Sequence, residues 1–180
     1  MAREALRDEL VALADHAWGR LADRLDGLTD DEYLWQPVAG CWTIRPGPAD
    51  PTAPWTWDFD WPPPEPPPVT TIAWRLAHLT VNDDRFRPWL GLVPDQGRQG
   101  RSVSPTAAGA VEAVETTAAE RRRDLLEVTD ADLWEPIGPV GGPYADGTRV
   151  SWVLHSLDEV VHHGAEVGLL RDLYRAGAAG

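Results

Sequence analysis

The strongest constraint on the fold is a long segment in the first half of the chain that cannot be helical. Between Pro37 and Thr70 the sequence PVAGCWTIRPGPADPTAPWTWDFDWPPPEPPPVT holds eleven prolines and four tryptophans. Proline lacks the backbone N–H that a helix or a central strand needs, so the segment excludes both. A disordered linker would be poor in tryptophan. We therefore predict that residues 38–69 form an ordered flap, with a plain linker as the alternative.

The flap is predicted to use its aromatic side chains as a cover. Its tryptophans are Trp42, Trp55, Trp57 and Trp61. Polyproline stretches would act as stiff struts between them. We expect these side chains to cover the mouth of a substrate site or a contact between subunits.

Amphipathic helices are predicted on both sides of the flap. Apolar residues recur at steps of three and four over about residues 2–26, 71–87, 105–127 and 148–175, which is the helical pattern. Ser104 followed by Pro105 indicates the start of the third helix. A chain of 180 residues can bury one good core. We predict a single domain over residues 1–180, an all-α up-and-down four-helix bundle with long connections and the flap between its first two helices.

Two similar stretches support this topology. GLTDDEYLWQP ends at Pro37, and EVTDADLWEP ends at Pro136. Each follows a predicted helix, offers a threonine and an aspartate to cap a short helical turn, and stops at proline. Each is expected to bury its tryptophan. The repetition is typical of a duplicated helical hairpin, which would bring the second and fourth long helices together.

Composition excludes several classes of protein. A net charge of −13 opposes binding to the phosphate backbone, so we expect no nucleic-acid partner. The apolar stretches are far shorter than the roughly 20 residues that span a bilayer, so we expect no membrane partner. The charged start MAREALRDEL is unlike a signal peptide, and the single cysteine, Cys41, excludes an internal disulfide framework. We expect a cytoplasmic protein in which this thiol is packed.

Histidines gather in HSLDEVVHHGAEVGLLRDL, which begins at His155. Glu159 and His163 are four apart, so they share a helix face and can chelate one ion. His155 is about 12 Å from His163 along the axis, too far to bind the same ion, and His162 points about 100° away. His78, midway along the second helix, is the candidate third ligand. Two histidines and one carboxylate leave coordination positions open, as in catalytic metal sites.

Each of these residues also has an ordinary interpretation. A histidine on a helix is often a hydrogen-bonded core residue, and a Glu/His pair four apart is often a surface pair. His155 and Asn82 are candidates to hydrogen-bond the metal ligands, or are solvated. Arg149 and Arg171 flank the last helix and could bind a carboxylated ligand, with plain surface charge as the alternative.

The phrases TIAWRLAHL and DEVVHHGAEVGLLRDL, with the two threonine-aspartate loops, resemble the DinB/YfiT-like superfamily of bacterial four-helix metalloproteins over nearly the whole chain. In that family a histidine of the second helix and a His-x-x-x-His pair of the last helix hold a divalent metal. His78 and His163 match two of those positions, and Glu159 stands at the third. A His, Glu, His set is similar to that of the mycothiol-dependent maleylpyruvate isomerase branch.

The resemblance implies a divalent metal, zinc first and nickel or iron as alternatives, held by His78, Glu159 and His163. It implies a thiol-dependent S-transferase or isomerase in which the metal activates a low-molecular-weight thiol such as mycothiol toward a small electrophile, and it implies a homodimer. The alternative is a non-catalytic metal-binding or stress-response module whose flap is an interaction surface. An iron oxygenase shares the ligand set and ranks last. An open coordination position reached through a cleft would favour an enzyme.

Overall fold

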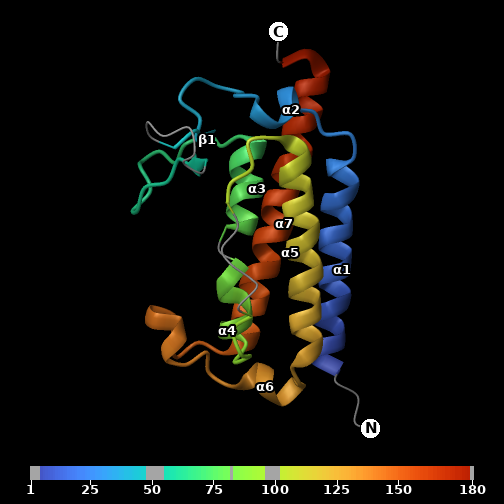
Figure 1. The fold of residues 1–180 in the computed structure, drawn as a ribbon, viewed down its shortest axis with the longest axis vertical. Helices are drawn as coiled ribbons and strands as arrows, with labels where there is room; N and C mark the ends of the chain where they lie inside the picture. The colour runs from blue at the N-terminus through green and yellow to red at the C-terminus, as the bar shows by residue number, and fades with distance from the viewer. Residues whose placement is uncertain (1–4, 48–54, 82, 96–101, 179–180) are drawn as a thin grey trace.

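The computed structural model describes residues 5–47, 55–81, 83–95 and 102–178 (Figure 1). The long helical segments are α1 (Ala5–Leu25), α3 (Ile72–Thr80) continued by α4 (Phe86–Trp89), α5 (Ala107–Glu127) and α7 (Arg149–Leu173). The shorter elements are α2 (Asp30–Leu34), α6 (Asp130–Trp134), 3-10 helices at Asp83–Arg85 and Pro139–Tyr144, a π-helical turn at Tyr174–Ala178, and strands β1 (Ile44–Arg45) and β2 (Thr56–Trp57). The prediction of an all-α bundle is confirmed. No helix in these ranges is both long and apolar enough to cross a membrane.

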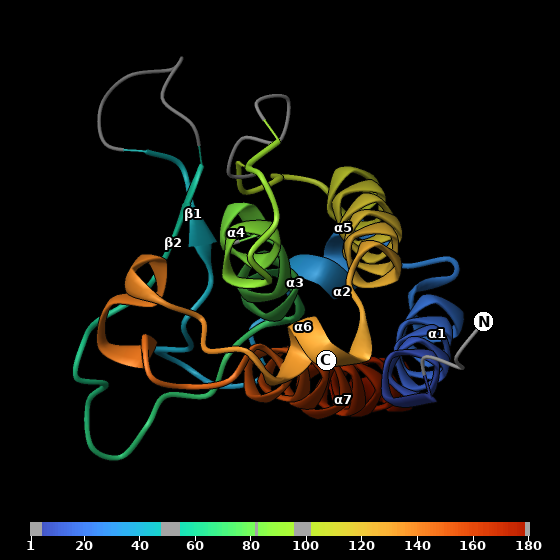
Figure 2. The ribbon, with the colours of Figure 1, turned by 90° about the horizontal axis from the view of Figure 1, so that it is seen from below.

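The four long segments form a square around one apolar core. Seen along the bundle, α1 lies beside α5 and α7, and α3 lies beside the same two helices (Figure 2). Leu21, Leu76, Leu125 and Val160 each expose 2% or less of their surface at the centre. Burying such a side chain stabilises the fold by about 1.5–3 kcal/mol. The order around the square places α3 directly against α7.

The second long helix is broken, contrary to the prediction of a continuous helix over residues 71–87. Its first part, α3, ends at Thr80, and a 3-10 turn separates it from α4. The Thr80 hydroxyl donates to the backbone carbonyls of Leu76 and Ala77 at 3.0 and 3.3 Å. Threonine bonded back to the preceding turn in this way weakens and bends a helix. The break leaves α4 as a separate short helix that follows α3 along the bundle.

The third long helix begins two residues later than predicted, so the assignment of Ser104 as its cap is wrong. Thr106 is the cap, because its Oγ1 accepts from the Gly109 N–H at 3.3 Å. Ser104 Oγ instead accepts from the Thr106 N–H at 3.2 Å. The Ala107 N–H donates to a carboxylate oxygen of Asp30 at 2.7 Å. This bond fastens the start of α5 to α2.

The two similar loops form the predicted capped turns, α2 and α6. Each has a capping box, formed by Thr29 with Glu32 and by Thr129 with Asp132. The expectation of buried tryptophans is wrong, because Trp134 is 63% exposed and Trp35 is only half-buried. The preceding turn supplies the buried side chain instead, Tyr33 in α2 and Leu133 in α6. In each short helix the residue that faces the core is one or two positions before the tryptophan.

The described part of the flap is fastened to the start of α3. Strands β1 and β2 pair antiparallel, with Ile44 opposite Trp57. The Asp58 carboxylate accepts from the Thr43 N–H at 2.9 Å, and the Asp58 carbonyl accepts from the indole Nε1 of Trp74 at 2.7 Å. Residues 48–54 of the predicted flap lie outside the described residues. The flap is therefore tied by hydrogen bonds to the helix that carries His78.

A buried ion pair joins the far end of the bundle. Arg171 is 1% exposed, and its Nη2 donates to Glu32 Oε2 at 3.0 Å. Its Nη1 also donates to the carbonyls of Arg24 and Asp26. Although burial pushes the pKa of Glu32 upward, the Arg171 hydrogen bond and the nearby guanidinium charges hold it below its usual range. Arg171 is thus a structural residue, and the expectation of surface charge or ligand binding there is wrong.

Replacing Arg171 by alanine should lower the free energy of unfolding by about 3 kcal/mol, because the buried Glu32 carboxylate would lose its main partner. Arg175 contacts the same carboxylate at 3.0 Å but is 54% exposed, so Arg175→Ala is the matched control and should cost under about 1 kcal/mol. Urea denaturation followed by circular dichroism measures both values. Equal losses in the two variants would contradict a central role for Arg171.

Candidate metal centre

The structure brings His78, Glu159 and His163 together where α3 meets α7. His78 Nε2 lies 2.8 Å from Glu159 Oε2, and His163 Nε2 lies 3.2 Å from the same oxygen. Ligand atoms bound about 2.1 Å from a zinc ion are at most about 4.2 Å apart, so both separations suit a shared ion. Two imidazole nitrogens and one carboxylate oxygen are also donors that zinc and similar ions accept. The residues present therefore fit a divalent metal.

Helix geometry explains this meeting of side chains. Glu159 and His163 lie one turn apart on α7 and project from one face. The Thr71 side chain caps α3 by accepting from the Trp74 N–H at 3.2 Å. This cap fixes where α3 begins and therefore which of its residues face α7. Trp74 and His78 then share the face toward α7 and stack, with ring centroids 5.1 Å apart and planes at 6°. Stacking holds the His78 ring, whose buried Nδ1 has no hydrogen-bond partner in the described parts of the chain.

His163 is held by a hydrogen bond to a carboxylate, which was not predicted from the sequence. Its Nδ1 lies 2.7 Å from Glu166 Oε2, and the same oxygen accepts from Arg75 Nη1 at 2.5 Å. A carboxylate on one ring nitrogen fixes the imidazole and leaves the other nitrogen to bind a metal. The signal available in the sequence was Glu166 three residues after His163, together with an arginine among apolar residues of the second helix.

The Glu159 carboxylate is kept in its charged form. Hydrogen bonds from His163 and His78 hold the pKa of Glu159 well below its usual range and outweigh the opposing effect of burial. The side chain remains 29% exposed, so the oxygen atoms are not sealed in the core. Glu159 is therefore an ionised oxygen donor at neutral pH.

The other predicted site residues lie around this centre or away from it. His155 Nε2 is 3.6 Å from Glu159 Oε1, one turn earlier on α7, and its side chain is 55% exposed. Asn82 lies outside the described residues. The Arg149 guanidinium packs over Gly91, where any larger residue would collide with it. His155 thus contacts a site residue, whereas Arg149 belongs to the packing at the start of α7.

The flap tryptophans divide into two groups. Trp57 lies 5.6 Å from the His78 ring and 5.2 Å from Trp74, and Trp42 lies 6.0 Å from Trp74. Trp55 instead forms a bridge to Val103, and Trp61 is 81% exposed. Two of the four therefore cover the flap side of the site, and Trp61 does not cover it.

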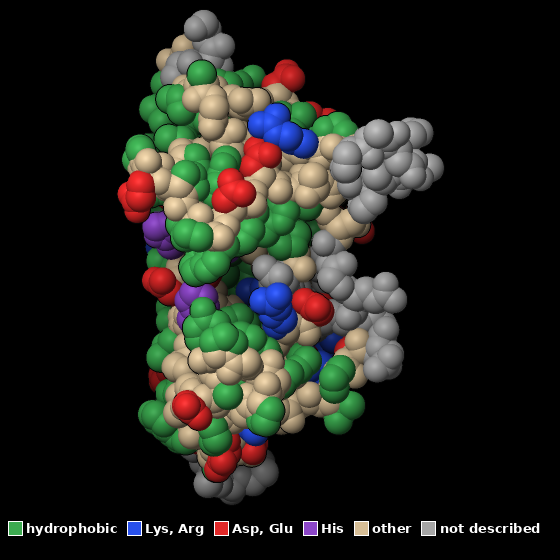
Figure 3. Space-filling model, turned by 90° about the vertical axis from the view of Figure 1, so that its left-hand side faces the viewer, with side chains coloured by type: hydrophobic (Ala, Val, Ile, Leu, Met, Phe, Trp, Pro, Cys, Tyr) green, Lys and Arg blue, Asp and Glu red, His purple; other side chains and the backbone are tan. Residues whose placement is uncertain are grey.

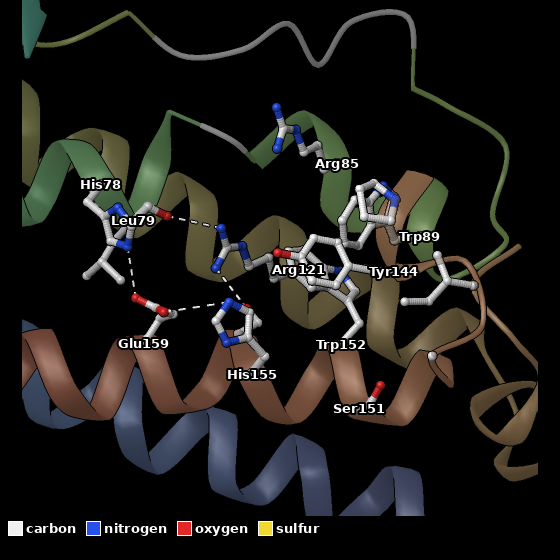
Figure 4. A pocket seen from close by; sticks show the side chains of 14 residues that line it. His78, Leu79, Arg85, Trp89, Arg121, Tyr144, Ser151, Trp152, His155 and Glu159 are labelled. Carbon is white, nitrogen blue, oxygen red and sulfur yellow. Dashed lines mark hydrogen bonds and ion pairs between the residues drawn. The ribbon is translucent and has the colours of Figure 1, made fainter. Parts of the chain in front are cut away.

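A cavity of about 640 Å³ opens on the other side of the centre. His78 and Glu159 form one end of it, and Trp89, Tyr144 and Trp152 stand toward the other end (Figure 4). The face of the molecule beside the flap is hollowed, with histidine and arginine side chains at the rim (Figure 3). Small-molecule sites are typically of this volume. The centre is thus reached from solvent through a cleft.

A sequence profile of the DinB superfamily matches residues 13–167. The chain belongs to the DinB superfamily. Searches of curated proteins and of solved structures returned no match. The matched range covers most of the bundle and contains His78, Glu159 and His163. Members of the DinB superfamily bind divalent metals, and the histidine and glutamate group of this chain has the composition to hold one.

A second group of candidate ligands in this DinB bundle is His162, His163 and Glu166. His162 is 62% exposed, and Glu166 is already bonded to Arg75. This group lies apart from the cavity lining. The Glu166 carboxylate orients His163, which is also a member of the first group. The two groups therefore form one centre, in which Glu166 supports a ligand.

Replacing Glu166 by glutamine should weaken zinc binding at least about tenfold, because the His163 ring loses its anionic partner. Glutamine keeps an oxygen for Arg75, so the fold should persist. Asp158→Ala, an exposed carboxylate of the same helix, is the control and should leave the affinity unchanged. Competition with a chromophoric chelator measures the affinity. Unchanged zinc binding in Glu166→Gln would show that this residue does not support the site.

Zinc affinity should fall at least about tenfold between about pH 7.5 and pH 5.5, because imidazole must be neutral to bind a metal and protons compete for its nitrogens. Glu159 does not contribute to this loss, since its lowered pKa keeps it ionised over the whole window. The same chelator competition, repeated at several pH values, measures the slope. An affinity that is flat over this range would contradict the histidine ligands.

Proposed function

We propose that the protein is a divalent-metal-dependent enzyme that joins a low-molecular-weight thiol, of the mycothiol type, to a small electrophile. The observation that carries the proposal is the group of His78, Glu159 and His163, of which His78 and Glu159 line one end of a solvent-connected cavity of about 640 Å³. Three protein ligands leave positions for small molecules, as catalytic metal sites do. The resemblance of the His, Glu, His set to mycothiol-dependent isomerases gives the thiol its candidate identity.

The residues would divide the work between holding an ion and shaping its surroundings. His78, Glu159 and His163 would hold it, with zinc first and nickel or iron as alternatives. A divalent ion held there supplies a Lewis acid that favours the deprotonated, nucleophilic form of a thiol near neutral pH. The electrophile would occupy the cavity, and either S-transfer or isomerisation by addition and elimination would follow.

The surrounding side chains have separate tasks in this proposal. Arg75 and Glu166 hold the His163 ring in one orientation. Trp57 and Trp74 pack around the ring of His78 and exclude water from the flap side. Excluding water from this side lowers the local dielectric constant, which strengthens electrostatic interactions within the site. Water and substrate would therefore enter from the cavity side.

A second candidate function is supported by the outer face of the flap. Trp61, Phe59 and Val69 expose 81%, 53% and 44% of their surface. Exposed apolar residues gathered in one segment are typical of interaction surfaces. A non-catalytic metal-binding or stress-response module would use this face. We rank it second because it gives the cavity beside the metal centre no task.

The test combines metal analysis with a thiol assay. The untagged protein, purified without chelators, should contain about one zinc, nickel or iron per chain by elemental mass spectrometry, and His163→Ala should contain much less. The same protein should accelerate the reaction of mycothiol with monochlorobimane, in which a C–S bond forms and chloride leaves, and His163→Ala should not. Asp158→Ala is the control for both measurements.

Each result decides between the candidates. Metal that is present in the parent and lost in His163→Ala, with loss of the thiol reaction, supports the enzyme. Metal without any thiol-dependent rate rejects thiol transfer and favours the binding module. No metal after reconstitution with excess divalent ions rejects both metal-based proposals.

A further inference from the structure

The end of the cavity farthest from the metal centre is aromatic. The Trp89 ring lies 4.4 Å from Trp152 and 5.9 Å from Tyr144. The three side chains come from α4, α7 and the 3-10 helix Pro139–Tyr144, so separate pieces of backbone converge on one apolar wall (Figure 4). Tyr144 is 63% exposed although it lines this wall. An aromatic ring inserted here would gain offset or edge-to-face contacts with its neighbours.

The charge of the cavity is opposite to that of the chain. The protein has 29 acidic and 16 basic residues, yet Glu159 is the single acidic residue of the cavity lining within the described ranges. Two arginines, Arg85 and Arg121, line the same cavity. A cleft lined by one sign of charge concentrates ligands of the other sign. The acidic surface outside would not favour anions, so this local basic character is specific to the cavity.

The two arginines are not equivalent. Arg121 donates to Ser156 Oγ and to the Leu79 carbonyl, both at 3.0 Å, and lies over the Phe86 ring. Its guanidinium is therefore already used in contacts within the cavity wall. Arg85 is exposed and makes no hydrogen bond or ion pair with another residue in the described parts of the chain. It stands on the 3-10 turn between the helix of His78 and the helix of Trp89. Arg85 is therefore placed to bind an anionic group of a ligand.

The spacing along α7 sets the length of a ligand that uses the whole cavity. Trp152 and Glu159 are seven residues apart on this helix, which is about 10 Å along its axis. His155 lies between them, with its ring 5.7 Å from Trp152. A molecule that touches both ends must therefore extend beyond a single ring. An aryl group with a short chain has about this length.

We propose that the cavity binds an aromatic anion, with its ring at Trp89, Tyr144 and Trp152, its acidic group at Arg85, and its remaining end toward Glu159. This inference rests on the proposed function, because it names the class of electrophile that such an enzyme would accept. That class is an aryl acid whose reactive centre lies about 10 Å from the aromatic wall of the cavity. The binding itself requires neither thiol nor metal.

Isothermal titration calorimetry with four probe compounds tests the proposal on the protein as purified and again with EDTA present. Phenylbutyrate should bind, whereas phenylbutylamine, phenylbutanol and hexanoate should each bind at least about tenfold more weakly, since they lack the anion or the ring. The result should not depend on EDTA. Equal binding of all four compounds, or no binding of phenylbutyrate, would overturn the proposal.

Two variants locate the binding, and both replace exposed side chains so that the fold is kept. Arg85→Gln should weaken phenylbutyrate about tenfold and leave phenylbutanol unchanged, while Tyr144→Leu should weaken both. Arg20→Gln, an exposed arginine of α1 that does not line the cavity, is the control and should change neither. Phenylbutyrate binding that is unaffected by Arg85→Gln and Tyr144→Leu would place it elsewhere and overturn the proposal.

The outcome is separate from that of the thiol assay. Selective phenylbutyrate binding without any thiol reaction would support the aromatic-anion site and reject thiol transfer. A thiol reaction in a protein that binds all four probes equally would support the enzyme and reject this substrate class.

Discussion

The contact between α3 and α7 is the constraint on which the site and the cavity depend. These two helices meet through Arg75, Glu166, His163, Glu159 and His78, which form one continuous chain of polar contacts. Partly buried polar groups are costly unless they are paired, so each member depends on the next. A helix arrangement that separated α3 from α7 would break the Arg75–Glu166 and His78–Glu159 contacts and leave Arg75 and His78 without these partners.

The sequence was sufficient to predict the bundle and the three central residues because both follow from periodicity. Spacing of four places Glu159 and His163 on one face, and the repeated hairpin brings the helix of His78 against them. Their role as metal ligands stays a prediction. Glu166 and Arg75 were not predicted, because a spacing of three on a helix describes an ordinary surface pair equally well. Only the position of α3 against α7 shows that Glu166 joins Arg75 to His163.

The features that sequence reasoning placed wrongly depend on a distant partner in one case and on neighbouring residues in the others. Arg171 was expected at the surface, but Glu32, far away in the sequence, draws it into the core. Trp134 was expected inside, but Leu133 fills that position. The helix start at Ser104 and the continuous second helix failed for local reasons, namely hydrogen bonds by Thr106 and Thr80 that compete with the regular backbone pattern. Helix propensity describes the average behaviour of threonine and does not reveal which side-chain hydrogen bonds Thr80 and Thr106 form.

The break after Thr80 divides the second helix between two tasks. The part before it carries His78 and belongs to the square of four long helical segments, while the part after it carries Trp89 and forms a wall of the cavity with the segment around Tyr144. In the proposed enzyme, the metal ligand His78 and the ring-binding residue Trp89 would therefore stand on separate pieces of backbone. Substitutions or changes of loop length after the break would alter this cavity wall, while the turn that carries His78 would keep its position against α7. If the proposed function holds, this arrangement would let one scaffold accept different substrates during evolution without rebuilding its metal centre.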